Sequence, residues 1–329
     1  MHWLRPWSRL AWLLWSLAAL FASCGRGAEA DGGRRLRIAV VPKGTAHDFW
    51  QAVHAGAQAA ATELGVEITW QGPQPEGDRE AQIRVVEAVV TRRVDGLLLA
   101  PVDHEALAGA VADAAKSGVP TVVFDSALDG AAHVAFVATD NRRGGELAGE
   151  RLAERLGGRG RVVMLRYQEG SASTAAREAG CLAALARHPG IQVVSDNQRA
   201  ANLEQARTVA DALLTAHRDV DGVFCPNEST TLGMLRALEA HGRAGKVQFV
   251  GFDASPPLSE ALAAGRIDAL VVQDPAGMGR AGVGLLVRHL RREQVPAVVH
   301  TELVVATKDN LATPAVRALL FPEAAGSGK

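Results

Sequence analysis

The chain has 329 residues, of which 48% are hydrophobic, so it is long enough for two α/β lobes, each with a core of its own. Its 35 Lys and Arg nearly balance its 36 Asp and Glu, and the formal net charge is −1. This charge gives no electrostatic argument for a nucleic-acid partner or for attraction to an anionic membrane surface.

The first residues predict export. Arg5 and Arg9 precede the apolar run Leu10–Phe21, and small residues follow it. A basic start, a short apolar run and small residues before a cleavage site are typical of a secretory signal. At about 1.5 Å per residue the run is too short to span a hydrocarbon core of about 30 Å. We therefore predict a signal peptide at residues 1–23 and a flexible tether, rich in small and polar residues, at 24–35.

The three cysteines have different expected roles. Ala-Ser-Cys at the end of the signal resembles the lipobox of bacterial lipoproteins, in which Cys24 would carry the lipid and become the first mature residue. Phe21 departs from the Leu that is usual there, and plain secretion with an incidental Cys24 is the alternative. Cys181 and Cys225 fall in apolar helix and strand patterns, so we expect buried free thiols rather than a disulfide.

Through the first half of the chain, short apolar runs alternate with segments of helical period. We predict strands at Leu36–Val41, Val66–Trp70, Gly96–Ala100 and Thr121–Asp125. We predict helices at Phe49–Leu64, Arg79–Thr91 and Glu105–Ser117. Val- and Leu-rich strands that alternate with helices indicate a parallel sheet covered on both faces.

The same alternation resumes after Val134–Asn141. We predict strands at Arg161–Leu165, Ile191–Ser195, Gly222–Pro226, Val247–Asp253, Asp268–Asp274 and His300–Thr307. We predict helices at Arg142–Leu156, Thr174–Arg187, Leu203–Ala216, Thr231–His241, Leu258–Ala264 and Met278–Arg292. Asn202 with Gln205 predicts a capping box before the third of these helices. The number of βα units is about twice that of one doubly wound domain, which favours two similar lobes in close contact.

In doubly wound sheets, ligands bind at the carboxyl ends of the strands, so the polar and aromatic residues after the strands are candidates for a binding site. They are Lys43, His47, Phe49, Trp50, Asp125, Arg177, Asn227, Asp253 and Gln273. The sequence contains no nucleophile elbow, no cofactor fingerprint and no metal-ligand cluster, so we expect neither an enzyme nor a cofactor or metal. Planar Asp, Asn, Gln and Arg groups can bind neighbouring hydroxyls in pairs, and an aromatic ring suits the C–H face of a sugar.

From Leu36 to about Thr307 the chain resembles the ribose-binding-protein branch of the periplasmic binding proteins, which are related to the ligand-binding domains of lactose-repressor-type regulators. The resemblance rests on nine stretches in family order: IAVVPKGTAHDFW, GAQAAATELG, VDGLLLAPVDHEAL, AAKSGVPTVVFDS, ATDNRRGGELAGE, STAAREAGCLAAL, TAHRDVDGVFCPNESTTLGMLRAL, VGFDASPP and VVQDPAGMG. Any one of these stretches is weak evidence, but together they are spread from Ile38 to Gly279.

The resemblance implies a type I periplasmic binding protein: two Rossmann-like three-layer α/β lobes joined by a three-segment hinge. The implied parts are an N-terminal lobe of residues 36–138 plus 275–299, a C-terminal lobe of 141–272 plus 302–321, and a tail of 322–329. The chain would then cross between the lobes near Thr139–Asn141, Gln273–Asp274 and His300–Thr301.

Position by position, the resemblance also implies ligand-binding roles for eight of the nine candidates. Phe49 and Trp50 fall on the family's aromatic pair, His47 on a pocket Asn and Asp125 on a pocket Asp. The remaining four match pocket residues directly: Arg177, Asn227, Asp253 and Gln273.

This sequence departs from ribose binders at three places. Ser126 replaces the Arg that follows Asp125, Ala201 stands where ribose binders carry a Phe, and PKGT brings Lys43 into a loop that otherwise contains Ser. These departures predict a ligand other than ribose itself.

The candidates are also open to structural interpretations that involve no ligand. These are a turn residue (Asp253), helix caps or interhelix ties (Asn227, Arg177), a hinge residue (Gln273), a core residue (Trp50) and a solvated rim residue (Lys43). Asp103 and His104 also follow a strand, and we interpret them as the start of a helix.

The function implied by the resemblance is capture of a monosaccharide by hinge closure and its delivery to the permease of an ABC importer. The protein would be a monomer in the periplasm, anchored to the membrane through its lipid, with no nucleic-acid partner. An alternative with the same fold binds an autoinducer-like signal, a polyol or a nucleoside for a membrane sensor. A cytoplasmic repressor would need a helix-turn-helix before Leu36, where the signal segment lies.

Overall fold

A computed structural model of the protein describes residues 34–130 and 132–320. The predicted signal peptide at 1–23, Cys24, the tether up to residue 33 and the predicted tail at 322–329 lie outside the described residues. In the part of the chain that is described, no helix has both the length and the apolar character needed to cross a membrane.

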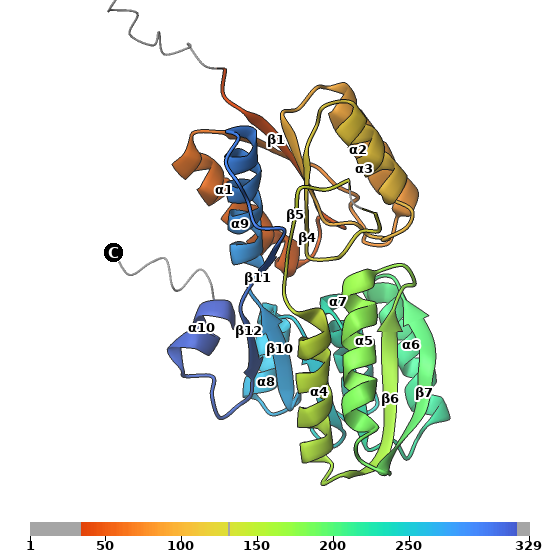
Figure 1. Ribbon diagram of the computed structural model, residues 1–329. Helices are drawn as coiled ribbons and strands as arrows, with labels where there is room; N and C mark the ends of the chain where they lie inside the picture. Colours follow the sequence, from red (N-terminus) through yellow and green to blue (C-terminus); the bar gives the residue numbers. More distant parts are fainter. Residues whose placement is uncertain (1–33, 131, 321–329) are drawn as a thin grey trace, which may run out of the picture. The chain divides into compact units, whose positions relative to one another are not determined.

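The N-terminal lobe is built on a six-stranded parallel sheet with the order β11-β5-β4-β3-β1-β2. The strands are β1 (Arg37–Val41), β2 (Glu67–Trp70), β3 (Gly96–Leu99), β4 (Thr121–Phe124), β5 (Ala135–Ala138) and β11 (Val298–His300). Helices α1 (Asp48–Leu64) and α9 (Pro275–Leu290) cover one face, and α2 (Arg79–Thr91) and α3 (Ala108–Lys116) cover the other (Figure 1). Alternate residues of β1 therefore enter different cores, which explains its continuous apolar sequence.

The C-terminal lobe has a second six-stranded sheet with the order β12-β10-β9-β8-β6-β7, in which only β12 is antiparallel to its neighbour. The strands are β6 (Arg159–Tyr167), β7 (Gly190–Ala200), β8 (Gly222–Phe224), β9 (Gln248–Phe252), β10 (Ala269–Gln273) and β12 (Leu303–Ala306). One face packs on α4 (Asn141–Arg155) and α5 (Ala172–Leu185). The other packs on α6 (Leu203–Ala216), α7 (Glu228–Ala240), α8 (Pro256–Ala263) and α10 (Pro314–Leu320). The two lobes thus share one strand order.

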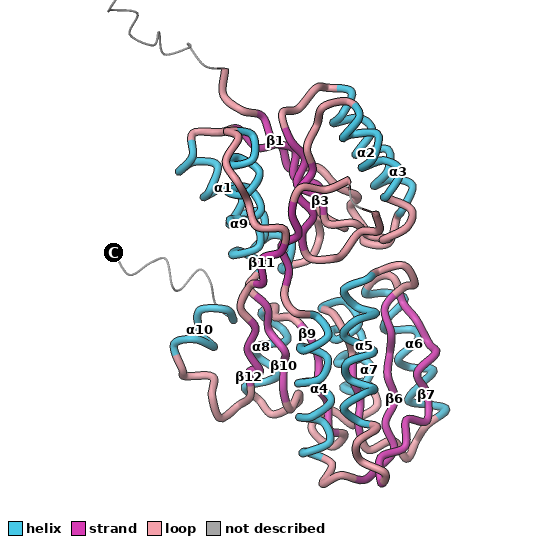
Figure 2. The backbone as a smooth tube through the Cα atoms, in the orientation of Figure 1, coloured by secondary structure: helices cyan, strands magenta, loops and turns pink. Residues whose placement is uncertain are grey.

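The described chain passes between the two sheets three times: after β5, after β10 and between β11 and β12 (Figure 2). We propose these passages as the lobe boundaries. The single strand predicted at His300–Thr307 is wrong, because the chain changes sheets within it. His300 pairs with Ala138 in the N-terminal sheet, whereas Leu303 pairs with Gln273 in the C-terminal sheet.

Three helices begin three residues away from their predicted starts, and one predicted helix cap forms only in part. Asp103 accepts from the backbone of Glu105 and Ala106, which forms a separate turn, so α3 begins only at Ala108. Helix α9 begins three residues earlier than predicted, at Pro275, as suits a residue without an N–H. The capping box predicted at Asn202 forms only in part, because the side chain of Gln205 accepts from Ala201 instead. Glu228 opens α7, three residues before the predicted start.

Each lobe contains a helix pair whose backbones touch through glycine. A Cβ on Gly145 of α4 would overlap the carbonyl of Arg177 in α5, and a Cβ on Gly56 of α1 would overlap the carbonyl of Ala276 in α9. These contacts fix the position of the α5 backbone from which the Arg177 side chain extends.

Candidate functional site

A cavity lies at the carboxyl ends of the strands of both sheets, between the two lobes. All nine candidate residues line it, together with five that sequence analysis did not single out: Glu76, Tyr167, Ser173, Thr174 and Glu228. The structure therefore brings the candidates together in one place, from strands and helices far apart in the chain. That these residues bind a ligand remains a prediction.

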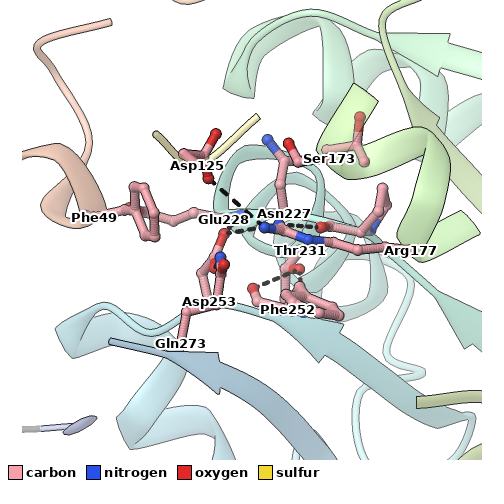
Figure 3. A network of polar contacts seen from close by, with 12 residues as sticks. Phe49, Asp125, Ser173, Arg177, Asn227, Glu228, Thr231, Phe252, Asp253 and Gln273 are labelled. Atoms are coloured by element: carbon pink, nitrogen blue, oxygen red, sulfur yellow. Dashed lines mark hydrogen bonds and ion pairs between the residues drawn. The ribbon is translucent and has the colours of Figure 1, made fainter. Parts of the chain in front are cut away.

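Two aspartates occupy equivalent corners of the two lobes. Asp125 follows β4 and Asp253 follows β9, and both have left-handed backbones with φ of 60° and 68°. Asp tolerates this region better than most side chains, so each is a turn residue as well as a cavity residue. In Figure 3 their carboxyl groups point toward the guanidinium of Arg177. Asp253 accepts from Gln273 Nε2 at 2.6 Å and from the backbone N–H of Glu228 at 3.0 Å.

Arg177 is the largest polar side chain in the site and is only 2% exposed. Its Nε donates to Asn141 Oδ1 at 2.7 Å, its Nη1 donates to the carbonyl of Pro226 at 3.0 Å, and its guanidinium lies 4.3 Å from the ring centroid of Phe252. It is therefore an interhelix tie. Its Nη2 lies 3.8 Å from Asp125 Oδ1, too far for a hydrogen bond, and has no hydrogen-bond partner among the described residues.

Gln273 has a buried acceptor without a hydrogen-bond partner, whereas Arg177 has a buried donor without one. It ends β10, next to the second passage between the lobes, and its Nε2 is used by Asp253. Its Oε1 is buried and has no hydrogen-bond partner among the described residues. A buried acceptor here and a buried donor on Arg177 are both costly unless something polar satisfies them.

Lys43 belongs to the site and not to the solvated rim, since it is only 4% exposed. Its Nζ lies 2.9 Å from Asp125 Oδ2 and donates to Ser173 Oγ at 2.9 Å and Ser171 Oγ at 3.2 Å. Because the serines begin α5, Lys43 links the two lobes. Asn227 is the N-cap of α7, where it forms a capping box with Thr230, and its side chain also lines the cavity.

The aromatic wall comes from the first turn of α1. Phe49 and Trp50 pack edge to face at 4.8 Å between ring centroids, and both line the cavity. Trp50 is also a core residue, so both its structural interpretation and its place in the cavity wall are correct. Ala201, which stands where ribose binders carry a Phe, is not among the cavity-lining residues. It lies next to Gly77, since a Cβ on Gly77 would come within 3.0 Å of the Ala201 Cβ.

Buried carboxyl groups surround His47. Burial alone would lower the pKa of its imidazole, but the carboxylate of Glu76, with smaller effects of Glu228 and Asp253, raises it to about 9. Burial raises the pKa of Glu228 to about 7, although His47 and the N–H of Phe49 oppose this. Burial also raises the pKa of Asp253, against the effect of Arg177.

Three cationic side chains thus face four carboxyl groups across the cavity: Lys43, His47 and Arg177 against Glu76, Asp125, Glu228 and Asp253. Since the pKa of Glu228 lies near neutrality, the charges nearly balance at neutral pH. A balanced, hydrogen-bonding cavity with one aromatic wall suits a neutral polar molecule better than an ion.

Two of the missed residues have a signal in the sequence. Glu228 directly follows Asn227 in the quoted stretch CPNE. Tyr167, the last residue of β6, lies two residues after the predicted strand end at Leu165, as Lys43 does after Val41. Glu76 lies in the middle of the β2–α2 loop, and no local pattern indicates that this loop enters the cavity.

Two further expectations concern metals and thiols. Within the described residues, the cluster best suited to a metal is His104, Glu105 and Asp129, which is largely exposed and does not line the cavity. Cys181 and Cys225 are buried and free, which confirms that they form no disulfide.

Comparisons with known proteins agree with this architecture. Residues 38–294 match the family model described as periplasmic binding protein domain. The chain is 32% identical to the D-ribose/D-allose-binding protein of Pseudomonas aeruginosa, over 78% of this chain and 82% of that protein. It is 30% identical to the ribose import binding protein RbsB of Escherichia coli, over 89% of this chain and 98% of that one.

Solved structures show the same similarity. A solute-binding protein of an ABC transporter from Agrobacterium vitis, with bound D-fucose, is 36% identical with a TM-score of 0.84, over 87% of this chain and 100% of that one. A carbohydrate transporter solute-binding protein from Agrobacterium radiobacter, in complex with D-arabinose, is 32% identical with a TM-score of 0.84, over 87% and 99%. These structures confirm the predicted two-lobed α/β fold.

Proposed function

Because this chain belongs to the periplasmic binding protein family, we propose that it is the solute-binding protein of an ABC importer and that its solute is a monosaccharide. The observation that supports this most directly is the pair of unsatisfied buried atoms in the cavity, Nη2 of Arg177 and Oε1 of Gln273. They are one donor and one acceptor, and a sugar hydroxyl can serve both.

The other groups extend the same chemistry. The carboxylates of Asp125 and Asp253 accept hydrogen bonds from hydroxyl groups, and Arg177 between them donates. Phe49 and Trp50 offer apolar ring surface to the C–H groups of the sugar. The near balance of charge in the cavity favours an uncharged sugar.

The division of the site between lobes supports hinge closure. His47, Trp50 and Asp125 belong to the N-terminal lobe, whereas Arg177 and Asp253 belong to the C-terminal lobe. A ligand that contacts both sets binds the closed form more tightly than the open form, and this difference in affinity shifts the equilibrium toward closure. The closed form is then the state that the permease receives.

The place of action follows from the first residues. The basic and apolar start of the chain and its match to the periplasmic binding protein domain support export to the periplasm. Ser23-Cys24 supports a lipid anchor at Cys24, from which a monomeric protein serves the permease of the importer.

Isothermal titration calorimetry tests the ligand class. Protein refolded from denaturant, and so freed of co-purified ligand, is titrated with D-ribose, D-allose, D-arabinose and D-fucose, the sugars of its relatives. Xylitol, a nucleoside and an autoinducer preparation serve as the alternative classes. We expect saturable binding of at least one sugar. If the protein bound only a compound that is not a sugar, the proposal that its solute is a monosaccharide would be refuted.

A further inference from the structure

Glu76 is a buried carboxylate whose bonds join three parts of the molecule. It lies in the β2–α2 loop and is only 8% exposed. Its Oε1 accepts from the indole Nε1 of Trp50 at 2.5 Å. Its Oε2 lies 3.3 Å from Nδ1 of His47 and accepts from the hydroxyl of Tyr167 at 3.2 Å. Trp50 and His47 belong to the N-terminal lobe, as Glu76 does, whereas Tyr167 belongs to the C-terminal lobe.

Tyr167 is held rigidly on its own side. Its backbone N–H donates to Oε1 of Glu178 at 3.0 Å, and its carbonyl accepts from Nη1 of Arg199 at 3.1 Å. Glu178 is fixed in turn by an ion pair with Arg166 at 3.0 Å. The phenol hydroxyl therefore projects from a fixed backbone and meets Glu76 across the cavity.

The bonds to Glu76 restrict two side chains of the proposed sugar site. A buried indole N–H needs an acceptor, and the bond to Oε1 of Glu76 fixes the plane of the Trp50 ring. His47 next to a carboxylate keeps its second proton, so both ring nitrogens are donors and Nε2 can donate to a hydroxyl. The carboxyl groups that face His47 are those of Glu76, Glu228 and Asp253.

We propose that Glu76 is a positioning residue, which orients Trp50 and His47 toward the ligand and, through the hydroxyl of Tyr167, makes that orientation depend on closure of the lobes. This inference rests on the proposed function, in which the cavity binds a sugar. Glu76 itself lines the cavity, but the role proposed here acts through Trp50 and His47.

The Glu76→Gln variant tests the carboxylate with little change in shape. Its amide oxygen can still accept from Trp50, but its NH2 group faces donors on His47 and Tyr167. We expect the affinity for whichever sugar of the panel the wild type binds to fall about tenfold or more. The matched control is Glu80→Gln, at an exposed carboxylate in the first turn of α2 whose partner is Arg84 at 3.6 Å.

The titration of His47 gives a readout that a purely structural role would not change. In protein with 13C-labelled histidine, assigned by the signal lost in His47→Gln, the wild-type imidazole should titrate near pH 9. In Glu76→Gln the midpoint should fall, because the main partner that opposes burial is gone. A midpoint that stays near 9 in Glu76→Gln overturns the assignment, whatever the sugar results are.

The link across the lobes has its own probe, because Tyr167 is the only tyrosine in the chain. Protein labelled with 3-fluorotyrosine gives a single 19F resonance, which we expect to shift on addition of the sugar and to shift less in Glu76→Gln. Tyr167→Phe removes only the hydroxyl, so it should weaken sugar binding severalfold while the midpoint of His47 stays raised.

The outcomes separate this inference from the proposed function. If the wild type binds a sugar and Glu76→Gln binds it equally well, the positioning role is wrong and the proposed function stands. If the wild type binds none of the sugars, the proposed function is wrong and the positioning role at a sugar falls with it. Loss of affinity in Glu80→Gln equal to that in Glu76→Gln also overturns the inference.

Discussion

Replacement of Asp253 by Asn should weaken sugar binding without unfolding the protein. Asn is similar in size and tolerates the left-handed backbone at φ 68°, so the turn after β9 is kept. The change removes one charge and one acceptor. Asp253 now accepts from Gln273 Nε2 and from the N–H of Glu228, whereas an amide can accept only one of these bonds with its oxygen.

The magnitude follows from the hydrogen bond that we propose between the Asp253 carboxylate and a sugar hydroxyl. Loss of one hydrogen bond to a charged group costs about 1.5–3 kcal/mol, which corresponds to about tenfold to 150-fold in affinity. Gln273 can relieve the clash by turning its amide, but it would then present a donor to the cavity where its Oε1 acceptor now lies. Either response disturbs the groups that we propose bind hydroxyls.

Stability should respond differently. Burial raises the pKa of Asp253, so the ionised form is disfavoured in the folded protein, and a neutral Asn avoids that cost. We expect the thermal midpoint of Asp253→Asn to stay close to that of the wild type. Asp253→Ala, in contrast, adds about 1–2 kcal/mol of backbone strain in the left-handed region and should lower it.

Calorimetric titration of both variants measures the sugar affinity, and thermal unfolding measures the midpoint. Near-native affinity in Asp253→Asn would show that the carboxylate takes no part in binding. An equal loss of thermal midpoint in the Asn and Ala variants would show that the backbone argument is wrong.

Four further results are expected. Cys24→Ser should abolish lipid labelling and release the exported protein from the membrane fraction. Unchanged fractionation and labelling would contradict the prediction that Cys24 carries a lipid. Gly145→Ala should lower the thermal midpoint and weaken binding, because its Cβ overlaps the carbonyl of Arg177, whereas Gly284→Ala, with no described atom within 4 Å, should raise the midpoint. The raised pKa of His47 contributes stability that is complete below pH 6.5 and is lost as the pH rises through about 9. The thermal midpoint of the wild type should therefore fall between these pH values, and that of His47→Gln should fall less. Small-angle scattering should show a smaller radius of gyration on saturation with sugar, and an unchanged radius in a protein shown to start open would exclude closure.

The fold could be predicted from the sequence because the relevant pattern is local. Runs such as Leu97–Leu99 and Val122–Phe124 are buried on both faces, and this requires a parallel sheet between layers of helices. The candidates that directly follow strands, such as Asp125 and Asp253, could be found because carboxyl ends of parallel strands converge at one edge.

What the sequence did not predict depends on contacts between distant segments. Glu76 enters the cavity because the β2–α2 loop meets the C-terminal lobe at Tyr167, and no periodicity in the loop indicates that contact. A lysine after a strand is usually solvated, but Lys43 is buried, where it pairs with Asp125 and donates to Ser171 and Ser173 of the other lobe. The division of the last predicted strand at His300 likewise depends on which sheet edge is open to pairing.

The passage of the chain between sheets also constrains the order of assembly. Strand β11 and helix α9 complete the N-terminal lobe, yet they follow β6 to β10 in the chain. Met278, Val283 and Leu286 of α9 belong to the same core as Ile38 and Val53, more than 200 residues earlier. In a chain that emerges from its N-terminus first, the N-terminal lobe thus has to wait for its last pieces while the C-terminal lobe can form most of its sheet. Such distant pairings slow folding. The core of the lobe that is synthesised first is therefore completed only after β6 to β10 of the other lobe have been made, and until then its incomplete core is the surface that a chaperone would have to protect.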